Sequence, residues 1–333
     1  MGYFEKTVIS LLGVCCVSLF TVAANRSQGK VYKSPKANFF DVAVGAPVIA
    51  NSLIGSLKKN DSNKYEFVTV KALSEKFTML DYDFGSVLVD GAAVPRILVI
   101  NMPRDIRKIR TAIDRKLIFF KTILPLILET NKDILQNRGR FLRIKAEIIK
   151  GEKASAVDRA WLAALADSYD VSPDNFSEIL RRVDIIPPSL ALAQAAEESG
   201  WGTSRFALEG NALFGQYAFD TKYSLVPMGR DKGKDHKIRA FSSLLDAVKS
   251  YAHNLNTHRA YKKFRSMRQG LRRKGYEITG NKLVGTLTSY SERGGKYVST
   301  IRSIINLNRL KNLDNAKIRR NFVVSGEWQQ INP

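Results

Sequence analysis

The sequence predicts an α+β protein that is mostly helical. Apolar residues recur at helical spacing over residues 105–139, and capping signals open further helices within residues 155–182. Residues 216–240 break this rhythm with proline and glycine, which is typical of a loop or a small β-hairpin. We therefore expect a helical body that carries one small β element.

The N-terminal segment, residues 1–24, has the features of an export signal. Lys6 gives it a positive start, and residues 7–24 are an unbroken run of apolar and small residues that ends in a small-residue cleavage site. Cleavage after Ala24 is the first expectation. The run is also just long enough to remain as a single anchor in the inner membrane.

Residues 25–103 are predicted to be a linker followed by a short β-rich segment. Residues 25–64 mix lysines with small and polar residues, as extended linkers do. Two runs favour β structure, Glu66–Val70 and Ile97–Ile100, and they are too few for a domain of their own.

Residues 104–154 are predicted to form a helical extension. Pro125 lacks the N–H group that an interior helical position uses, so it should kink or divide this helix. The apolar stripe of the helix indicates core packing and comprises Ile106, Ile109, Ile113, Leu117, Phe120, Leu124 and Ile127.

Caps mark the helices of the next segment, residues 155–310. Ser155-Ala156-Val157-Asp158 has capping-box spacing before a helix that ends at Tyr169, and Ser172-Pro173 opens another that ends near Arg182. Later helices are expected over residues 244–255, 259–272 and 296–307, before a basic tail over residues 311–333.

A carboxylate at the end of an apolar helix is the most informative feature of the chain. The run Ala193-Gln194-Ala195-Ala196-Glu197-Glu198-Ser199-Gly200-Trp201-Gly202 follows Pro187 and Pro188, which suit a first helical turn, and Gly200 supplies the stop. A carboxylate in the last turn faces the negative end of the helix dipole, which disfavours its ionised form. A carboxyl group that stays protonated near neutral pH is what the general acid of a glycosidase requires.

A second segment, Gly210-Asn211-Ala212-Leu213-Phe214-Gly215-Gln216, follows closely. Asn and Gly suit a tight turn, and Phe214 offers an apolar plane that could stack on a sugar. Together the two segments resemble the catalytic core of glycoside hydrolase family 73, the bacterial endo-β-N-acetylglucosaminidases that cut peptidoglycan. The resemblance covers residues 155–308, and the matches over Arg182–Gln194 and Tyr251–His258 favour its Bax-type subgroup of bacterial envelope proteins.

The resemblance implies a lysozyme-like glucosaminidase domain over residues 155–310. Glu198, and not Glu197, matches the proton donor of the family. Tyr290 matches a tyrosine that lines the cleavage subsite, where its hydroxyl can position water or the acetamido group of the substrate. The resemblance also assigns a group of residues to substrate binding, namely Gln194, Trp201, Asn211, Phe214, Gly215, Tyr251 and Tyr297.

Two of these residues have a structural alternative. Trp201 follows the acid directly, so it is either a wall of the acid's apolar pocket or a core residue. Tyr251 lies at helical spacing with Leu244 and Val248, which favours core packing.

The second catalytic group is open. The family often draws a second acid from the β-lobe, but residues 216–240 contain no glutamate, only Asp220, Asp231 and Asp235. Asp235 is our candidate, because it lies closest to the Phe241 segment that the resemblance includes. A substrate-assisted route, in which the N-acetyl group of the substrate is the nucleophile, needs no second acid.

Charge and cysteine content bound the partners and the compartment. The formal net charge of +22 favours anionic partners, such as peptidoglycan strands with carboxylates on their peptides or an anionic membrane surface. Basic clusters such as Lys262–Lys274 resemble solvated helix faces rather than a nucleic-acid motif, so no nucleic acid is expected. Both cysteines, Cys15 and Cys16, lie in the export signal, so the mature chain would fold without a disulfide in an oxidising compartment.

We therefore expect a monomeric, exported peptidoglycan hydrolase of the periplasm that cleaves the β-1,4 bond after N-acetylglucosamine and uses no cofactor. His253 and His258 are not spaced to share one helix face, so no metal site is expected. One alternative is a lytic transglycosylase, which usually has Gly-Leu-Met-Gln where this chain has Leu213-Phe214-Gly215-Gln216. The other is a catalytically silent, basic envelope-binding scaffold.

Overall fold

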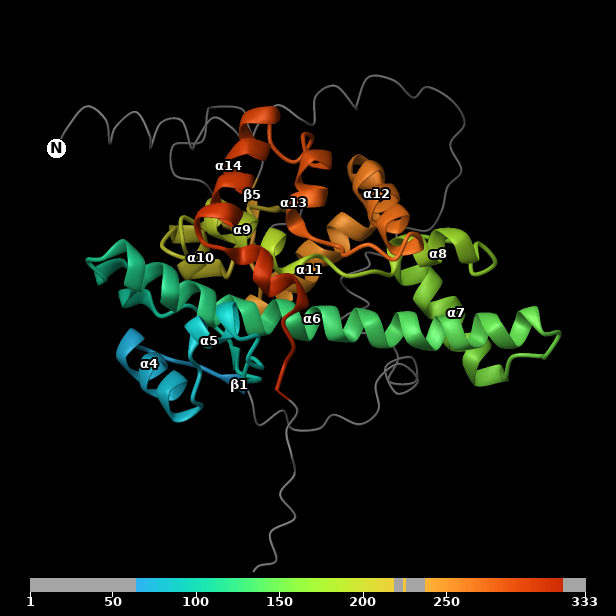
Figure 1. The fold of residues 1–333 in the computed structure, drawn as a ribbon, viewed down its shortest axis with the longest axis horizontal. Coiled ribbons are helices and arrows are strands. Elements are labelled where there is room, and N and C mark those ends of the chain that lie inside the picture. Colours follow the sequence, from blue (N-terminus) through green and yellow to red (C-terminus); the bar gives the residue numbers. More distant parts are fainter. Residues whose placement is uncertain (1–63, 219–223, 226–236, 320–333) are drawn as a thin grey trace, which may run out of the picture.

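The computed structural model describes residues 64–218, 224–225 and 237–319. The predictions for the export signal, for most of the linker and for Asp235 fall outside these residues. Within them the protein is mostly helical with only short strands, as predicted (Figure 1).

A long helix, α6 (Ala112–Ile149), runs through the middle of the molecule (Figure 1). It has 38 residues, which corresponds to a length of about 57 Å. The helix continues through Pro125, so the prediction that this proline divides it is wrong. The turns on both sides of Pro125 are buried and α6 packs on α9 (Pro188–Ser199) and α11 (Leu244–Thr257), and this packing outweighs a proline penalty of about 3 kcal/mol.

The segment before α6 combines short helices with one pair of strands. Strands β1 (Lys64–Tyr65) and β2 (Leu98–Val99) pair in parallel, so the predicted strand at Ile97–Ile100 is confirmed in its centre. The strand predicted at Glu66–Val70 is wrong, because the Thr69 side chain accepts from Ala72 N at 3.2 Å and caps a helix there. The helices of this segment are α4 (Val70–Met79), α5 (Phe84–Val89) and η1 (Arg104–Lys108).

The helices after α6 begin at polar caps. Ser155 caps α7 (Ala156–Ser168), as the capping-box spacing predicts, and its hydroxyl accepts from Asp158 N at 3.0 Å. Helix α8 (Phe176–Arg182) ends where predicted but begins after Asn175, whose side chain accepts from Glu178 N. Helix α10 (Arg205–Gly210) follows α9.

A small antiparallel sheet confirms the predicted β element. Strand β5 (Lys237–Arg239) lies between β3 (Tyr217–Ala218) and β4 (Ser224–Leu225). Ile238 pairs with Tyr217 on one side and with Leu225 on the other.

The C-terminal part consists of short helices, and those from residue 280 onward pack on α9 through Gly280–Leu283, Gly295–Leu307 and Leu310–Asn315. The helices of this part are η2 (Arg259–Tyr261), α12 (Lys262–Arg273), α13 (Gly280–Leu283), η3 (Val284–Thr286), α14 (Gly295–Leu307) and η4 (Leu310–Asn315). Ile318 then forms a parallel bridge with Val94, so the start of the predicted tail returns to the N-terminal segment.

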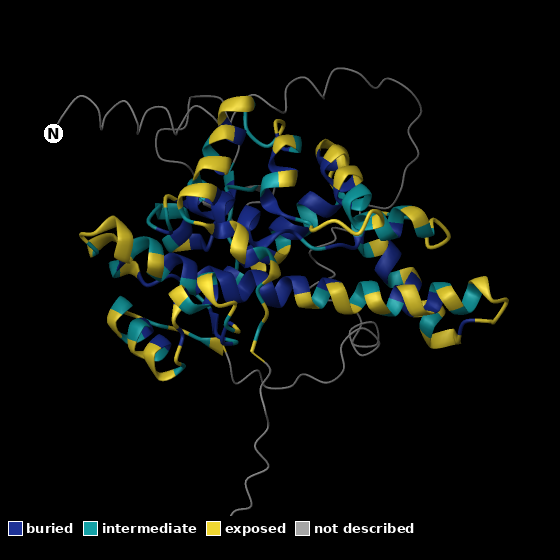
Figure 2. Ribbon diagram, viewed as in Figure 1, coloured by how far each residue is buried: buried dark blue, intermediate teal, exposed yellow. Residues whose placement is uncertain are grey.

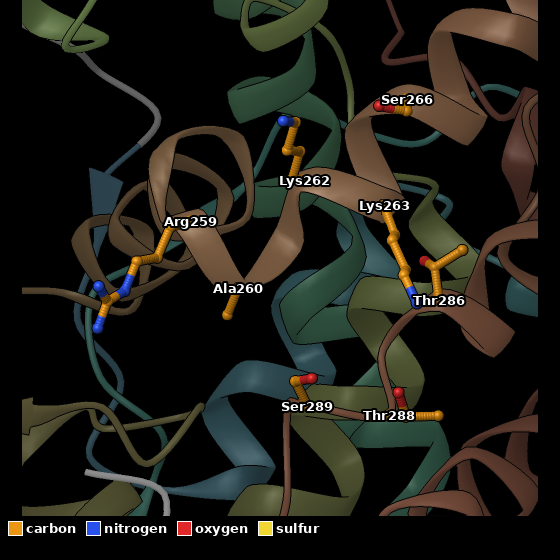
Figure 3. A pocket seen from close by; sticks show the side chains of 8 residues that line it. All are labelled: Arg259, Ala260, Lys262, Lys263, Ser266, Thr286, Thr288 and Ser289. Carbon is orange, nitrogen blue, oxygen red and sulfur yellow. The ribbon is translucent and has the colours of Figure 1, made fainter. Parts of the chain in front are cut away.

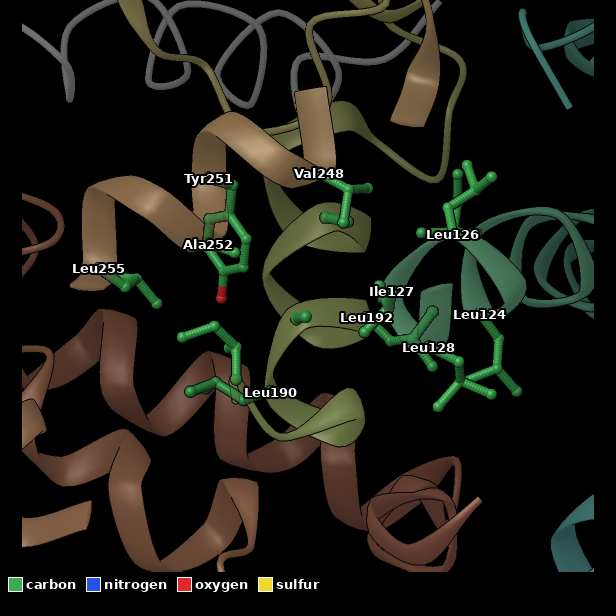
Figure 4. Packing of buried hydrophobic residues seen from close by; sticks show 14 of the residues in the cluster. Leu124, Leu126, Ile127, Leu128, Leu190, Leu192, Val248, Tyr251, Ala252 and Leu255 are labelled. Atoms are coloured by element: carbon green, nitrogen blue, oxygen red, sulfur yellow. The ribbon is translucent and has the colours of Figure 1, made fainter. Parts of the chain in front are cut away.

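One continuous hydrophobic core joins these elements, from Leu73 to Leu313. Figure 2 shows that α9 and the middle of α6 are the most buried helices, and Figure 4 shows apolar side chains of α6, α9 and α11 packed together. Every residue of α9 from Pro188 to Ala196 is buried, so the helix that carries Glu198 is held from all sides. No helix in the described ranges is long and apolar enough to cross a membrane.

Candidate active site around Glu198

Helix α9 delivers Glu198 to the site at its C-terminal end. Pro188 occupies the first turn and Gly200, in the left-handed conformation with φ 56°, ends the helix, as the sequence predicts. Asp314 of η4 accepts from the amide and the hydroxyl of Ser189, both at 2.8 Å, and so holds the beginning of the helix. Glu198 stands one residue before the last residue of the helix.

The turn after α9 is strained and tightly packed. Gly200, Trp201 and Gly202 all have positive φ, which is uncommon for a tryptophan. The Trp201 ring lies 5.9 and 5.4 Å from the rings of Phe119 and Phe120 on α6, which holds the residue in this conformation. A side chain at Gly202 would approach the Phe119 ring to 3.2 Å, so only glycine fits. The turn therefore fixes the end of α9 against α6.

The Glu198 carboxyl group is desolvated although the residue is partly exposed. Burial raises its pKa to about 7, while a hydrogen bond with Tyr297 acts in the opposite direction. The charge of Glu197 raises the same pKa and the charge of Arg293 lowers it, both by smaller amounts. A carboxyl group with this pKa is largely protonated in mildly acidic solution and can act as a general acid.

A buried hydrogen-bond chain orients the acid. The Tyr251 hydroxyl donates to Gln194 Oε1 at 2.7 Å, which turns the Gln194 amide group toward the Tyr297 oxygen at 2.9 Å. Since Tyr297 accepts this bond, its own proton is free to be donated to Glu198, which agrees with the raised pKa of Tyr297 beside that carboxyl group. The chain therefore directs the hydroxyl proton of Tyr297, and not a lone pair of its oxygen, toward Glu198.

Aromatic stacking supports this chain from both sides. Phe214 stacks on Tyr251 with a centroid distance of 3.9 Å and an interplanar angle of 7°. Tyr290 stacks on Tyr297 at 5.4 Å and 8°, and the Tyr261 ring lies 5.9 Å from Tyr290. Tyr290 is partly exposed, whereas Tyr297 is buried beneath it.

The turn that carries Asn211 and Gly215 lies beside Glu198. Asn211, in the left-handed conformation, ends α10 and donates to Asn101 Oδ1 at 2.8 Å, so its role here is to hold the turn. A methyl group on Gly215 would lie 3.7 Å from Glu198 Oε2, which places the Gly215 backbone beside the Glu198 carboxyl group. Glycine at this position keeps one side of Glu198 open.

Glu197 faces a different partner. Arg293 donates to Glu197 Oε1 at 2.6 Å and to Thr300 Oγ1 at 2.7 Å, which ties the end of α9 to α14. Glu197 thus takes part in an ion pair while Glu198 enters the hydrogen-bond chain, and this difference agrees with the choice of Glu198 as the acid.

Five of the residues that the resemblance assigns to substrate binding are packed within the fold. Gln194, Tyr251 and Tyr297 are at most 1% exposed and form the hydrogen-bond chain beside Glu198, and their assignment to substrate binding stays a prediction. Phe214 is 4% exposed with one face on Tyr251, which leaves no plane for a sugar. Trp201 packs on α6, which corresponds to the core alternative.

Other predicted site residues have separate outcomes. Tyr290 lies above Tyr297, as expected for a residue near the acid, and its assignment to the reaction stays a prediction. Asp235 lies outside the described residues, and its assignment also stays a prediction. In the described parts of the chain, no group of three or more His, Cys, Asp or Glu residues could hold a metal ion.

Tyr261, Arg293 and Asp314 also support the site, and no sequence pattern indicates this. Arg293 follows Tyr290 closely in the sequence, but its pairing with Glu197 depends on how the start of α14 meets the end of α9. Asp314 lies in the segment predicted as a basic tail, and only the tertiary structure brings it to the start of α9. These contacts join residues that are far apart in the sequence, so no local pattern predicts them.

We expect Tyr297→Phe to raise the pKa of Glu198 further. The substitution keeps the ring stacked on Tyr290 but removes the hydroxyl that donates to the carboxylate, and such a bond to a charged group contributes about 1.5–3 kcal/mol. The alkaline limb of the kcat/KM profile should therefore move up by about one pH unit. Tyr276→Phe, at a tyrosine that is 59% exposed, is the control, and an unmoved limb in Tyr297→Phe would contradict the chain.

We also expect the free energy of unfolding to fall as the pH rises from 5 to 8. The pKa of Glu198, about 7, and that of Asp314, about 6, both lie above their ordinary values, mainly because both groups are buried. Stability from a raised acid pKa is complete below the unfolded pKa and is lost as the pH passes the folded pKa. Glu198→Gln should therefore be more stable than the wild type at pH 8, by about 2–3 kcal/mol, and equally stable at pH 4. Chemical denaturation at both pH values measures this, and an equal gain in Glu197→Gln would contradict it.

Comparison with known proteins places the chain among glycoside hydrolases. Residues 173–310 match the glucosaminidase family, described as mannosyl-glycoprotein endo-beta-N-acetylglucosaminidase. The chain is 35% identical to protein Bax of Escherichia coli (strain K12) over 199 residues, which are 58% of this chain and 69% of Bax. Among solved structures, the catalytic domain of the autolysin Auto from Listeria monocytogenes matches with 17% identity and a TM-score of 0.31, over 51% of this chain and 94% of that chain. The family match and the identity to Bax show that this chain belongs to the glucosaminidase family, glycoside hydrolase family 73, in its Bax-type subgroup.

Proposed function

We propose that this protein is an exported peptidoglycan hydrolase that cleaves the β-1,4 bond after N-acetylglucosamine, with Glu198 as the proton donor. The observation that supports this most is the desolvated Glu198 carboxyl group with its pKa raised to about 7. Membership of a glycoside hydrolase family supports the reaction class. The basic charge of +22 supports an anionic polymer as the substrate.

In the proposed reaction Glu198 protonates the glycosidic oxygen as the bond between that oxygen and the anomeric carbon breaks. Water then adds its oxygen to the anomeric carbon and returns a proton to the Glu198 carboxylate. The Tyr251–Gln194–Tyr297 chain holds the acid in place, and Tyr290 positions water or the acetamido group of the substrate.

The nucleophile in this proposal is the substrate's own acetamido group or a water held by Tyr290, with Asp235 as an assisting acid. Deacetylated glycan strands distinguish these routes, because they lack the acetamido oxygen. Slow cleavage of such strands supports the substrate-assisted route. Cleavage at the normal rate, together with an inactive Asp235→Asn enzyme, supports a second carboxylate.

Analysis of the products tests the proposed function. Purified peptidoglycan is digested, reduced with borohydride and examined by mass spectrometry, with Glu198→Gln as the control. We expect reduced N-acetylglucosamine at the new chain ends. Reduced muramic acid would indicate a muramidase, anhydro-muramic acid a transglycosylase, and no products at all a silent scaffold.

Export to the periplasm is part of the proposal, and it is supported by the apolar run over residues 7–24. N-terminal sequencing of the envelope fraction should give Asn25 as the first residue. An intact Met1 in that fraction would favour a membrane anchor, and a purely cytoplasmic protein would contradict export.

A further inference from the structure

A pocket of about 420 Å³ lies at the start of α12, and all but one of the residues that line it have polar or charged side chains (Figure 3). One side is formed by η2 and the first turns of α12, with Arg259, Lys262 and Lys263. The other side is the segment from the end of η3 to Ser289. In Figure 3 the Lys263 side chain extends across the pocket toward Thr286.

The cations of this pocket have no acidic partner among the described residues. Other cations of α12 are satisfied within the fold: Arg268 donates to backbone carbonyl groups and Arg272 pairs with Asp184 at 2.6 Å. By contrast, within residues 64–218, 224–225 and 237–319, no carboxylate pairs with the three cations at the pocket, Arg259, Lys262 and Lys263. Their positive charges therefore remain available to an anionic ligand.

Hydroxyl groups complete the lining. The hydroxyl groups of Thr288, Ser289 and Ser266 form no hydrogen bond with another residue in the described part of the chain, so their protons can be donated to a ligand. Cations combined with several hydroxyl donors suit a carboxylate, because its two oxygens accept several charge-assisted hydrogen bonds at once.

The pocket is connected to the acid by adjacent tyrosines. Ser289 directly precedes Tyr290, and Tyr261, at the end of η2, lies 5.9 Å from the Tyr290 ring. Tyr290 in turn stacks on Tyr297, which is hydrogen-bonded to Glu198. Through Ser289 the pocket therefore adjoins Tyr290, so a ligand that covers Tyr290 can extend into it.

We propose that this pocket binds a carboxylate of the branch that muramic acid carries, next to the bond that is cleaved. The inference rests on the proposed function. A bond cleaved after N-acetylglucosamine has muramic acid as the next sugar, and its lactyl group bears either a peptide with free carboxylates or, without the peptide, a carboxylate of its own. The pocket makes the enzyme prefer strands that bear this branch over a neutral β-1,4-linked N-acetylglucosamine polymer.

Binding measurements in an inactive background test this proposal. Glu198→Gln protein is titrated by calorimetry with three ligands. They are a peptide-bearing peptidoglycan tetrasaccharide, the same tetrasaccharide after amidase treatment, and fully N-acetylated chitotetraose, which is neutral. Low ionic strength is used so that charge interactions are least screened. The added substitutions are Arg259→Gln with Lys263→Gln in the pocket and, as the control with the same change in net charge, Arg273→Gln with Lys274→Gln at the far end of α12.

We expect the pocket pair to lower the ratio of affinities, peptide-bearing strand over chitotetraose, by about tenfold or more, which is the scale of one lost charged contact. The control pair should leave this ratio unchanged. The amidase-treated strand identifies the carboxylate in protein with the pocket intact. If this strand is preferred over chitotetraose as strongly as the peptide-bearing strand is, the carboxylate is that of the lactyl group. If the preference is lost, the carboxylate is one of the peptide. An unchanged ratio in the pocket pair, or an equal fall in the control pair, overturns the proposal. The proposed hydrolysis is judged separately, by the products that the wild-type enzyme releases.

Discussion

Glu198→Gln is expected to lower kcat on peptidoglycan by at least about a hundredfold, the usual scale of general acid catalysis. The amide has nearly the same shape and can still meet Tyr297, so the fold should be retained, but it has no acidic proton to donate. Release of soluble fragments from purified peptidoglycan measures the rate, and circular dichroism with a thermal melt checks the fold.

Glu197→Gln is the matched control for this experiment. Glu197 pairs with Arg293 at 2.6 Å, and its side chain is 23% exposed, so its loss should change kcat little. If Glu197→Gln is inactive and Glu198→Gln is active, the assignment of the proton donor is wrong by one residue. Glu197, and not Glu198, would then be the proton donor at the end of α9.

The second large effect is expected for Arg268→Met, and it concerns stability. Arg268 is fully buried, with contacts to four backbone carbonyl groups in residues 181–185, directly before α9. Burial disfavours the charged form of Asp184. Arg272, Arg268 and Arg138 together outweigh this effect and hold the pKa of its carboxyl group below the ordinary value. Methionine fills a similar volume but leaves these carbonyl groups unpaired and removes one positive charge near Asp184.

We expect Arg268→Met to lower the free energy of unfolding by about 3–5 kcal/mol, as for other buried charges that lose a partner. Urea denaturation measures the change. Arg273→Met, at an exposed position of the same helix, should have little effect. Equal midpoints for the two variants would show that the contacts of Arg268 contribute little to the fold.

Local signals in the sequence were sufficient for the bounds of α7 and α9. The spacing of Ser155 and Asp158 marks the start of α7, and the two prolines and the glycine mark the start and the end of α9, because these signals act through neighbouring residues. Glu198 could be chosen from its helix and from the family resemblance together.

Features that depend on distant contacts could not be predicted. Pro125 stays inside α6 because α9 and α11 bury the turns around it, and a sequence pattern carries no measure of that packing. Similarly, the roles of Gln194 and Tyr251 depend on Tyr297, which lies 103 residues after Gln194 in the chain. The hydrogen-bond chain that these residues form therefore has no local signal in the sequence.

The pH profile of kcat/KM for the wild-type enzyme tests the central claim, that Glu198 is the proton donor, most directly. With a pKa of about 7 for Glu198, kcat/KM should fall tenfold for each pH unit above about 7, because only the protonated form donates. A profile that stays flat from pH 6 to pH 9, or that falls toward acid over this range, would contradict the assignment of Glu198 as a general acid.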